Sequence, residues 1–452
     1  MEATSGRGRP ALLVGAVAAA VAVAFADSSI VVLALPELYA RFDASIEGVA
    51  WVITSYNLVV ALGALALAAV VPRAHARVVL AAGSIVFLGA SIACALAGSL
   101  GVLIAGRSVQ GAGAALLLVG SPAVLCHLRG STSRGVATWT MAGTLGVAMG
   151  PALGGILTQA FDWRSIFLAQ APIAAAALVA AAGHPRGRAA GGQPSGWRAL
   201  PANLALGLLF GALVGALFLG VLLVIDVFGH PPIRGAAIVT LIPATALAAW
   251  PLATDLPAGR AIAAGSALLA AGLVGLALLP SGAMAFVLGS LALCGVGLGL
   301  SVPTLTHAAL ERDLGRGVTL TVGLRHVGLV LSIVLVAPLL THDLTAAADV
   351  AELNATASIV DAEIPARTKI PLALDIRDAL ERAPRGEIPD LSGPFDEHGA
   401  GTDAAVRRTQ DELVGSVQIA IARGFRRAFA VCALLAALAL VPLAALRRRS
   451  SP

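Results

Sequence analysis

The chain has 452 residues, of which 58% are hydrophobic and only 12% are charged, and its mean hydropathy is +0.90. Soluble domains carry roughly 25% charged and about 45–50% apolar residues, so these values exclude a water-soluble protein. The net charge is +5, but the basic residues are dispersed and form no basic helix. Nucleic acid is therefore not an expected partner.

Residues suited to covalent, metal or nucleotide chemistry are scarce. The four cysteines each fall inside an apolar block and no C-x-x-C pair occurs, so neither a disulfide framework nor a zinc site is indicated. No Walker A string occurs, so ATP is not the expected energy source. We expect no enzyme and no cofactor.

Twelve apolar blocks follow one another along the chain, most of them long enough to cross a hydrocarbon core of roughly 30 Å. Because backbone groups in lipid must be hydrogen-bonded internally, each block is expected to be a helix. The blocks also lack the alternating pattern of a membrane barrel. The expected spans are 11–35, 49–71, 78–97, 101–125, 136–160, 166–183, 202–225, 236–253, 261–279, 283–305, 318–340 and 426–446.

The arginines predict the orientation, because cytoplasmic loops carry an excess of basic residues. With the N-terminus inside, the inner segments hold fifteen arginines and the short outer loops hold three, Arg41, Arg164 and Arg234. We therefore expect a multi-pass protein of the cytoplasmic (inner or plasma) membrane with both termini cytoplasmic.

Two polar segments divide the spans. A Gly-, Pro- and Arg-rich stretch separates six spans from six, and an acidic stretch with fifteen acids and eight bases follows the eleventh span. Leu372 and Ile376, and Val406 and Leu413, keep helical spacing within that acidic stretch, so it is expected to be partly helical. The predicted divisions are a six-helix bundle over 1–183, a cytoplasmic linker over 184–201, spans seven to eleven over 202–340, an extracytoplasmic insertion over 341–424, and the last span with its tail over 425–452.

The fifth block contains the string G-x-x-x-G-P-x-x-G-G, formed by Gly146, Gly150, Pro151, Gly154 and Gly155. Glycines at this spacing clear one helix face, so that a neighbouring helix can approach closely. A proline in mid-span frees a carbonyl and permits a bend. A generic small-residue contact is the alternative, since the chain holds 50 glycines.

This string resembles the antiporter motif of the major facilitator superfamily. The fourth block is similar to a second motif of that family, L-x-x-x-R-x-x-Q-G-x-G-A-A, through Leu103, Arg107 and Gln110. The first block, from Asp27 to Pro36, resembles the opening of the drug:proton antiporters usually built with fourteen spans. The resemblance covers about residues 20 to 340. It implies an all-α major facilitator fold, with two six-helix bundles around a central cavity.

The chain departs from that family pattern in three places. The two extra central spans are missing, which leaves a twelve-span form. In the family, a loop G-x-L-A-D-R-x-G-R-R-R after the second span is thought to hold the two halves together on the inner side. Here that loop, Val70 to Arg77, lacks the acid and the glycine, so this contact is not expected in its usual form. The acidic insertion over 341–424 is not part of the common pattern.

Ionisable residues inside the apolar blocks are the candidates for function, since a charge in lipid costs at least roughly 2.5–3.5 kcal/mol and therefore faces a cavity or a partner. Asp27 and Arg107 are expected to line the central cavity and to couple transport to protons. An arginine beside a carboxylate favours its charged form, whereas apolar surroundings favour the protonated form. The alternative is a static ion pair that only fixes helix packing.

Arg325 and His326 form a second polar pair, inside the eleventh span. Arg325 requires a counter-charge, and the candidates are Asp27 across the cavity or an anionic substrate. Alternatively Arg325 hydrogen-bonds backbone carbonyls, with His326 packed beside it, and His326 could also relay a proton. Tyr56, Asn57 and Gln110 are expected to line the cavity with this pair.

The expected function is secondary active transport by alternating access. The resemblance implies export driven by proton influx, as in multidrug antiporters. Aromatic residues make up only 4% of the chain, which disfavours capture of bulky organic cations and favours a lipophilic neutral or anionic molecule or a lipid as cargo. The alternative is a scaffold or sensor without transport that binds an extracytoplasmic protein through 341–424.

Overall fold

The computed structural model describes residues 5–69, 75–182, 199–279, 284–310, 316–362, 364–382, 392–398 and 403–442. The predicted linker therefore lies almost entirely outside the described residues, as does most of the loop after the second span. The elements in chain order are α1 (Ser5–Ile30), η1 (Val31–Ala34), α2 (Leu35–Phe42), α3 (Ile46–Leu67), α4 (Ala76–Ala95), α5 (Leu100–Leu128), α6 (Thr132–Ala160), α7 (Arg164–Ala182), α8 (Leu200–Leu222), η2 (Leu223–Val227), α9 (Pro232–Val239), α10 (Leu241–Asp255), α11 (Ala258–Leu278), α12 (Met284–Leu310), α13 (Arg316–Asp361), α14 (Ala366–Arg382), α15 (Ser392–Glu397), α16 (Ala404–Gly424) and α17 (Arg426–Leu438).

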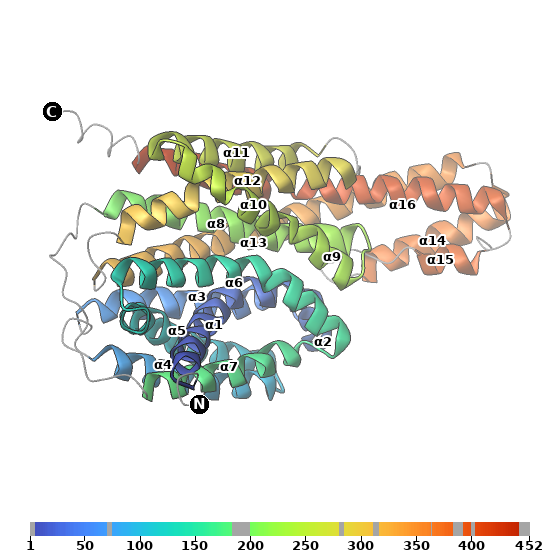
Figure 1. Ribbon diagram of the computed structural model, residues 1–452. Helices are drawn as coiled ribbons and strands as arrows, with labels where there is room; N and C mark the ends of the chain where they lie inside the picture. The colour runs from blue at the N-terminus through green and yellow to red at the C-terminus, as the bar shows by residue number, and fades with distance from the viewer. Residues whose placement is uncertain are drawn as a thin grey trace.

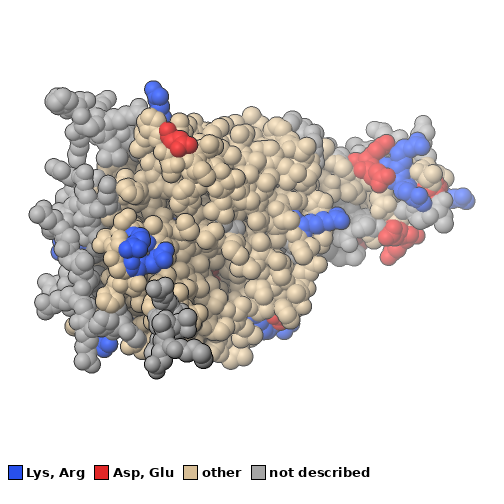
Figure 2. All heavy atoms as spheres, in the orientation of Figure 1, with Lys and Arg blue, Asp and Glu red and all other residues tan. Residues whose placement is uncertain are grey.

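The described residues confirm an all-helical membrane protein. By length and composition, eleven of the described helical segments could each cross a bilayer, and α6 is a twelfth if its two bent parts are taken as one span. Figure 2 shows a helical body whose visible surface carries few charged side chains, as expected of a surface that faces lipid.

The helices form two groups that lie against each other (Figure 1). In the first group α1 packs on α6, and α5 packs on α3 and α4. In the second group α8 packs on α13, and α12 packs on α10 and α11. The two groups meet mainly where α3 packs against α13 and where α6 packs against α9. This is the arrangement expected of two six-helix bundles.

The first span ends earlier than expected. Residues 11–35 were expected to form one span, but α1 ends at Ile30, a 3-10 turn follows, and α2 runs on from Leu35 to Phe42. Pro36 is the physical reason, because it has no N–H to donate to the carbonyl of Val32. The N–H of Leu35 donates to that carbonyl instead, which tightens the helix by one residue.

The eleventh span runs on into the insertion. Helix α13 continues without a break from Arg316 to Asp361, so the division predicted at 340 falls inside a helix. Helices α14, α15 and α16 complete a helical projection at one end of the molecule (Figure 1), and charged side chains gather on it (Figure 2). The apolar series predicted in the sequence forms its core, with Leu372, Ile376, Val406 and Leu413 all buried.

Two polar contacts hold the projection together and attach it to the body. His398, after α15, lies 2.6 Å from the carboxylate of Asp375 on α14. At its base, Arg427 of α17 donates to Asp343 of α13 over 2.8 Å. Helix α16 leads almost directly into the last span, and Asp403 caps its start by accepting a hydrogen bond from the N–H of Ala405.

Helix α6 has the close packing and the bend that its glycine-proline string predicts. The helix bends by 44° between Val147 and Met149. Pro151 cannot donate to the carbonyl of Val147, and the hydroxyl of Ser29 on α1 lies 3.4 Å from that carbonyl and donates to it. A hydroxyl from the neighbouring helix thus replaces the missing backbone donor.

Three glycines of the string face α1 directly. A side chain at Gly146, Gly150 or Gly154 would collide with α1, at the backbone of Ala22, the hydroxyl of Ser29 and the backbone of Ile30 respectively. Gly155 is buried in the same segment. The string therefore brings α1 and α6 into contact at backbone distance along about two helical turns.

We predict that Gly146→Leu forces α1 and α6 apart and destabilises the protein. Overpacking of this kind costs about 1–3 kcal/mol, so the purified protein should melt at a lower temperature. Gly89→Leu on α4 is the matched control, because it makes the same substitution in a helix where nothing lies within 4 Å of the new Cβ. Equal melting temperatures for the two variants would show that the close contact is not required.

Candidate functional site

A buried ion pair joins α1 to α5. The Nη1 atom of Arg107 donates to the Oδ2 atom of Asp27, and both side chains are fully buried. Arg107 also donates from Nη1 to Gln110 Oε1 over 2.6 Å and from Nε to the carbonyl of Val52 on α3 over 3.0 Å. The carboxylate and guanidinium thus compensate each other in a region that water does not reach.

Two glutamines close the ion pair into a ring. Gln170 on α7 donates to Asp27 Oδ1 over 2.6 Å, and Gln110 donates to Gln170 Oε1 over 2.7 Å. Gln110 also donates to the hydroxyl of Ser91 on α4 over 2.9 Å. The ring of Asp27, Arg107, Gln110 and Gln170, together with Ser91, ties α1, α4, α5 and α7 to one another.

Aromatic rings cover Arg107. Its guanidinium carbon lies 4.2 Å from the ring centre of Tyr56 and 5.7 Å from that of Phe167. The Tyr56 hydroxyl donates to the carbonyl of Ala24 over 2.7 Å. Arg107 Nη2 is the one buried atom of the ring without a hydrogen-bond partner among the described residues. The two N–H groups of this nitrogen therefore have no described acceptor.

The ring lies inside the first helix group, and neither Asp27 nor Arg107 lines the cavity described below. All its members belong to the first helix group, and Asp27 does not pair with Arg325. Residues two apart on a helix point in nearly opposite directions. Asp27 therefore points to α5 and α7, whereas Phe25 contacts Trp139 of α6 and His326 of α13.

Arg325 lies between aromatic rings of the two groups. Its guanidinium carbon is 4.1 Å from the ring centre of Phe25 on α1 and 3.4 Å from that of Phe210 on α8. No described carboxylate pairs with Arg325, and its Nε atom is buried without a partner. His326 Nδ1 lies 2.8 Å from the carbonyl of Val322 one turn earlier. Among the described residues, Arg325 therefore pairs neither with Asp27 nor with a backbone carbonyl, the two protein partners predicted for it.

The remaining predicted residues connect helices of the first group. Asn57 on α3 accepts a hydrogen bond from Ser28 on α1 over 2.8 Å and donates to the carbonyl of Ile53. Tyr56 and Asn57 are buried, as is Gln110. The hydrogen bonds of Tyr56 and Asn57 join α3 to α1, and those of Gln110 join α5 to α4 and α7.

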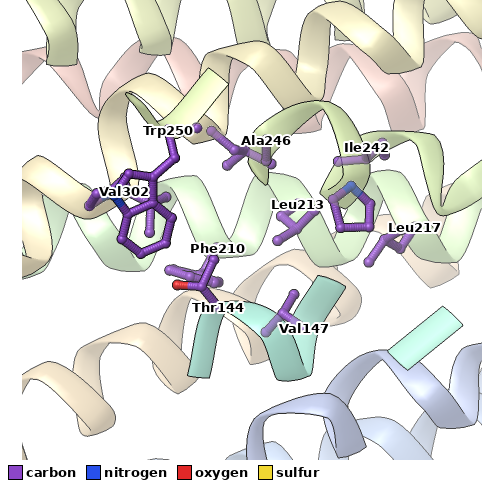
Figure 3. Close-up of a pocket in the computed structure, with 13 residues that line it drawn as sticks. Thr144, Val147, Phe210, Leu213, Leu217, Ile242, Ala246, Trp250 and Val302 are labelled. Carbon is purple, nitrogen blue, oxygen red and sulfur yellow. The ribbon is translucent and has the colours of Figure 1, made fainter. Parts of the chain in front are cut away.

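An apolar cavity opens between the two helix groups (Figure 3). Its volume is about 40 Å³. None of the five predicted cavity residues, Tyr56, Asn57, Gln110, Arg325 and His326, lines it. The residues that do are Thr144, Val147, Phe210, Leu213, Leu217, Ile242, Pro243, Ala246, Trp250, Leu298, Gly299, Val302 and Pro303.

The cavity lining is almost entirely aliphatic and aromatic, and it comes from α6, α8, α10 and α12. Thr144 and Val147 lie on α6 just before its bend, on the opposite side of the cavity from Trp250, Ala246 and Ile242 (Figure 3). Sequence reasoning missed this lining because its residues do not differ from the lipid-facing ones in composition. The nearby Gly-Pro string was the one available indication.

The Major Facilitator Superfamily model matches residues 17–339 of the chain. The chain belongs to the major facilitator superfamily. This confirms the resemblance found in the sequence and places the protein in a family of membrane transporters rather than enzymes.

Two similar proteins of the superfamily carry names from drug and antibiotic resistance. Drug efflux pump JefA of Mycobacterium tuberculosis (strain ATCC 25618 / H37Rv) is 34% identical over 170 residues, which are 37% of this chain and 34% of that protein. Methylenomycin A resistance protein of Bacillus subtilis (strain 168) is 35% identical over 183 residues, 40% of this chain and 39% of that protein. The matched segments thus span little more than a third of either relative.

Solved structures of superfamily transporters share the fold. A bacterial homolog to the human lysosomal transporter Spinster, in an inward-facing and unoccupied conformation, aligns with a TM-score of 0.63 over 98% of both chains at 17% identity. A D-xylose-proton symporter aligns with a TM-score of 0.59 over 71% of this chain and 88% of its own, at 13% identity. At these identities the likeness concerns the fold alone.

We predict that Gln170→Leu weakens the buried ring, because Asp27 Oδ1 and Gln110 each lose a partner. A hydrogen bond to a charged group contributes about 1.5–3 kcal/mol, so the melting temperature of the purified protein should fall. Gln159→Leu at the exposed end of α6 is the control, since it removes only a contact to the N–H of Ile233. A Gln170→Leu protein as stable as this control would contradict the assigned ring.

Proposed function

We propose that the protein is a proton-coupled exporter of lipophilic organic molecules. The observation that carries the proposal is the buried ring in which Asp27 meets Arg107, Gln110 and Gln170. A titratable carboxylate in the membrane interior is costly, and it marks proton relays in pumps and transporters. The similar proteins named for drug efflux and antibiotic resistance support the direction of transport.

Protonation of Asp27 would remove the charge that Arg107 compensates. A buried guanidinium without its partner is unstable by about 3–5 kcal/mol, so it must move or find another acceptor. Arg107 also holds the carbonyl of Val52 and lies on the ring of Tyr56. A proton at Asp27 therefore changes the contacts among α1, α3 and α5 together.

Helix α1 connects this change to the cavity. Two residues after Asp27, Ser29 donates to the carbonyl freed by the bend of α6, and Gly146 of α6 faces the backbone of Ala22. Val147, at the same bend, lines the cavity. A shift of α1 would move α6 and reshape the cavity wall, as alternating access requires.

The cavity favours lipophilic cargo because its lining offers little hydrogen bonding. Ligand pockets in proteins are likewise lined mainly by hydrophobic and aromatic side chains. We place both termini in the cytoplasm of a cell with this protein in its inner or plasma membrane, on the arginine count. The projection built from 341–424 then lies on the outer side.

The projection also supports a second candidate, a membrane scaffold or sensor that binds an extracytoplasmic protein. Its helices pack on one another, and Leu372 of α14 and Leu413 of α16 are fully buried. Such a scaffold would gain nothing from the buried ring around Asp27, which is why we prefer transport.

Flux measurements in proteoliposomes test the proposal. We expect a neutral naphthylamine dye to move faster when a proton gradient is imposed and a protonophore to abolish the increase. Asp27→Asn should lose at least about tenfold of the gradient-driven rate, equivalent to 1.4 kcal/mol. Asp255→Asn, at the exposed end of α10, removes the same charge outside the ring and should behave as wild type.

Gradient-driven flux that survives in Asp27→Asn would refute the coupling. If neither protein moves any cargo, and deletion of 345–415 abolishes a complex with an extracytoplasmic protein, the scaffold is the correct function.

A further inference from the structure

Arg325 is a buried cation that no described residue satisfies. Its side chain is 8% exposed, and its Nε atom is buried without a hydrogen bond from any described residue. A guanidinium has five N–H donors and stays charged in proteins. By contrast, Arg107 donates three hydrogen bonds to described residues, one of them to a carboxylate. Both arginines keep a buried nitrogen without a described partner, but only Arg107 has a carboxylate beside it.

The described contacts of the Arg325 guanidinium are with aromatic rings. Phe25 and Phe210 lie within 4.1 and 3.4 Å of the guanidinium carbon, measured to their ring centres. Rings stabilise a cation through its faces and supply no acceptor for its N–H groups. The unused donors lie along the edge of the guanidinium, in the fork that matches a carboxylate or a phosphate.

His326 adds a second unpaired group beside this arginine. Its Nδ1 atom lies 2.8 Å from the carbonyl of Val322, which can only accept, so Nδ1 carries the hydrogen of the neutral ring. Its Nε2 atom is buried without a described partner. Phe25 stacks on the His326 ring and also covers Arg325. Two unsatisfied polar groups thus share one aromatic neighbour.

Phe210 connects these groups to the apolar cavity. Its ring covers Arg325 and is also part of the cavity lining. Arg325, a cation without a described hydrogen-bond partner, therefore lies behind Phe210, one of the side chains that form the wall of the apolar cavity. A molecule with an acidic group and an apolar body matches both parts.

We propose that Arg325 binds the acid group of an amphiphilic organic anion whose apolar body occupies the cavity between α6, α8, α10 and α12. The inference that this anion is transported rests on the proposed function, whereas its binding does not. The carboxylate or phosphate supplies the acceptors that Arg325 lacks, and where the group is a singly protonated phosphate the His326 Nε2 lone pair can accept from its hydroxyl.

The test compares an acid with its own ester. Trp250 lines the cavity, so a brominated chain bound there quenches its fluorescence. Purified protein in phosphatidylcholine nanodiscs is titrated with dibrominated stearate and with its methyl ester, and Trp250→Phe identifies the signal. We expect wild type to bind the acid at least about tenfold more tightly than the ester.

Arg325→Met should abolish this preference and leave the affinity for the ester unchanged. Arg129→Met is the matched control, because it removes an exposed arginine that donates to Thr138 far from the cavity. Equal affinities of wild type for acid and ester overturn the proposal without need of any variant. A preference that persists in Arg325→Met overturns it as well.

A further arm identifies the source of the anion. Phosphatidic acid that displaces the brominated stearate, where added phosphatidylcholine does not, points to a membrane lipid, and failure to displace it points to a free organic acid. The binding assay uses no proton gradient. A preference for the acid without gradient-driven flux would therefore refute export but support the Arg325 site. Flux without a preference for the acid would support export but refute the site.

Discussion

The structure depends on how one pair of opposite charges is kept in the membrane interior. Asp27 and Arg107 can both stay buried only because each makes several polar contacts, with Gln170, Gln110 and the carbonyl of Val52 among them. Those contacts come from different helices, so the same interaction that stabilises the charges also fixes the first helix group. A change of charge at Asp27 therefore alters contacts among several helices of the first group.

Helix α1 turns this local constraint into a link between sites. Asp27 is part of the buried ring. Phe25, two residues earlier, contacts Trp139 of α6 and covers Arg325 of the second group. Ala22 and Ser29 of the same helix touch the glycines of α6. The buried ring, the bend of α6 and the unsatisfied arginine thus share one rigid element, although no residue of the ring lines the described cavity.

The sequence predicted the spans and the helices of the insertion, because apolar length is a strong constraint, and it singled out Asp27 and Arg107 as charges inside the spans. It did not predict Gln170, although a lone glutamine in the apolar α7 was a usable signal. The pairing of Asp27 could not be read from the chain, since it depends on which face of α1 meets α5. The end of α1 was set by Pro36, and the cavity lining by packing that composition does not encode.

The most direct measurement of the central claim is the protonation of Asp27 itself. Infrared difference spectra of the protein in nanodiscs, recorded on acidification with cargo dye present, should show a carboxylic acid C=O band that is missing in Asp27→Asn. If wild type and Asp27→Asn give the same spectra while wild type still exports the dye with the proton gradient, the buried ion pair is a static structural element and the coupling lies elsewhere.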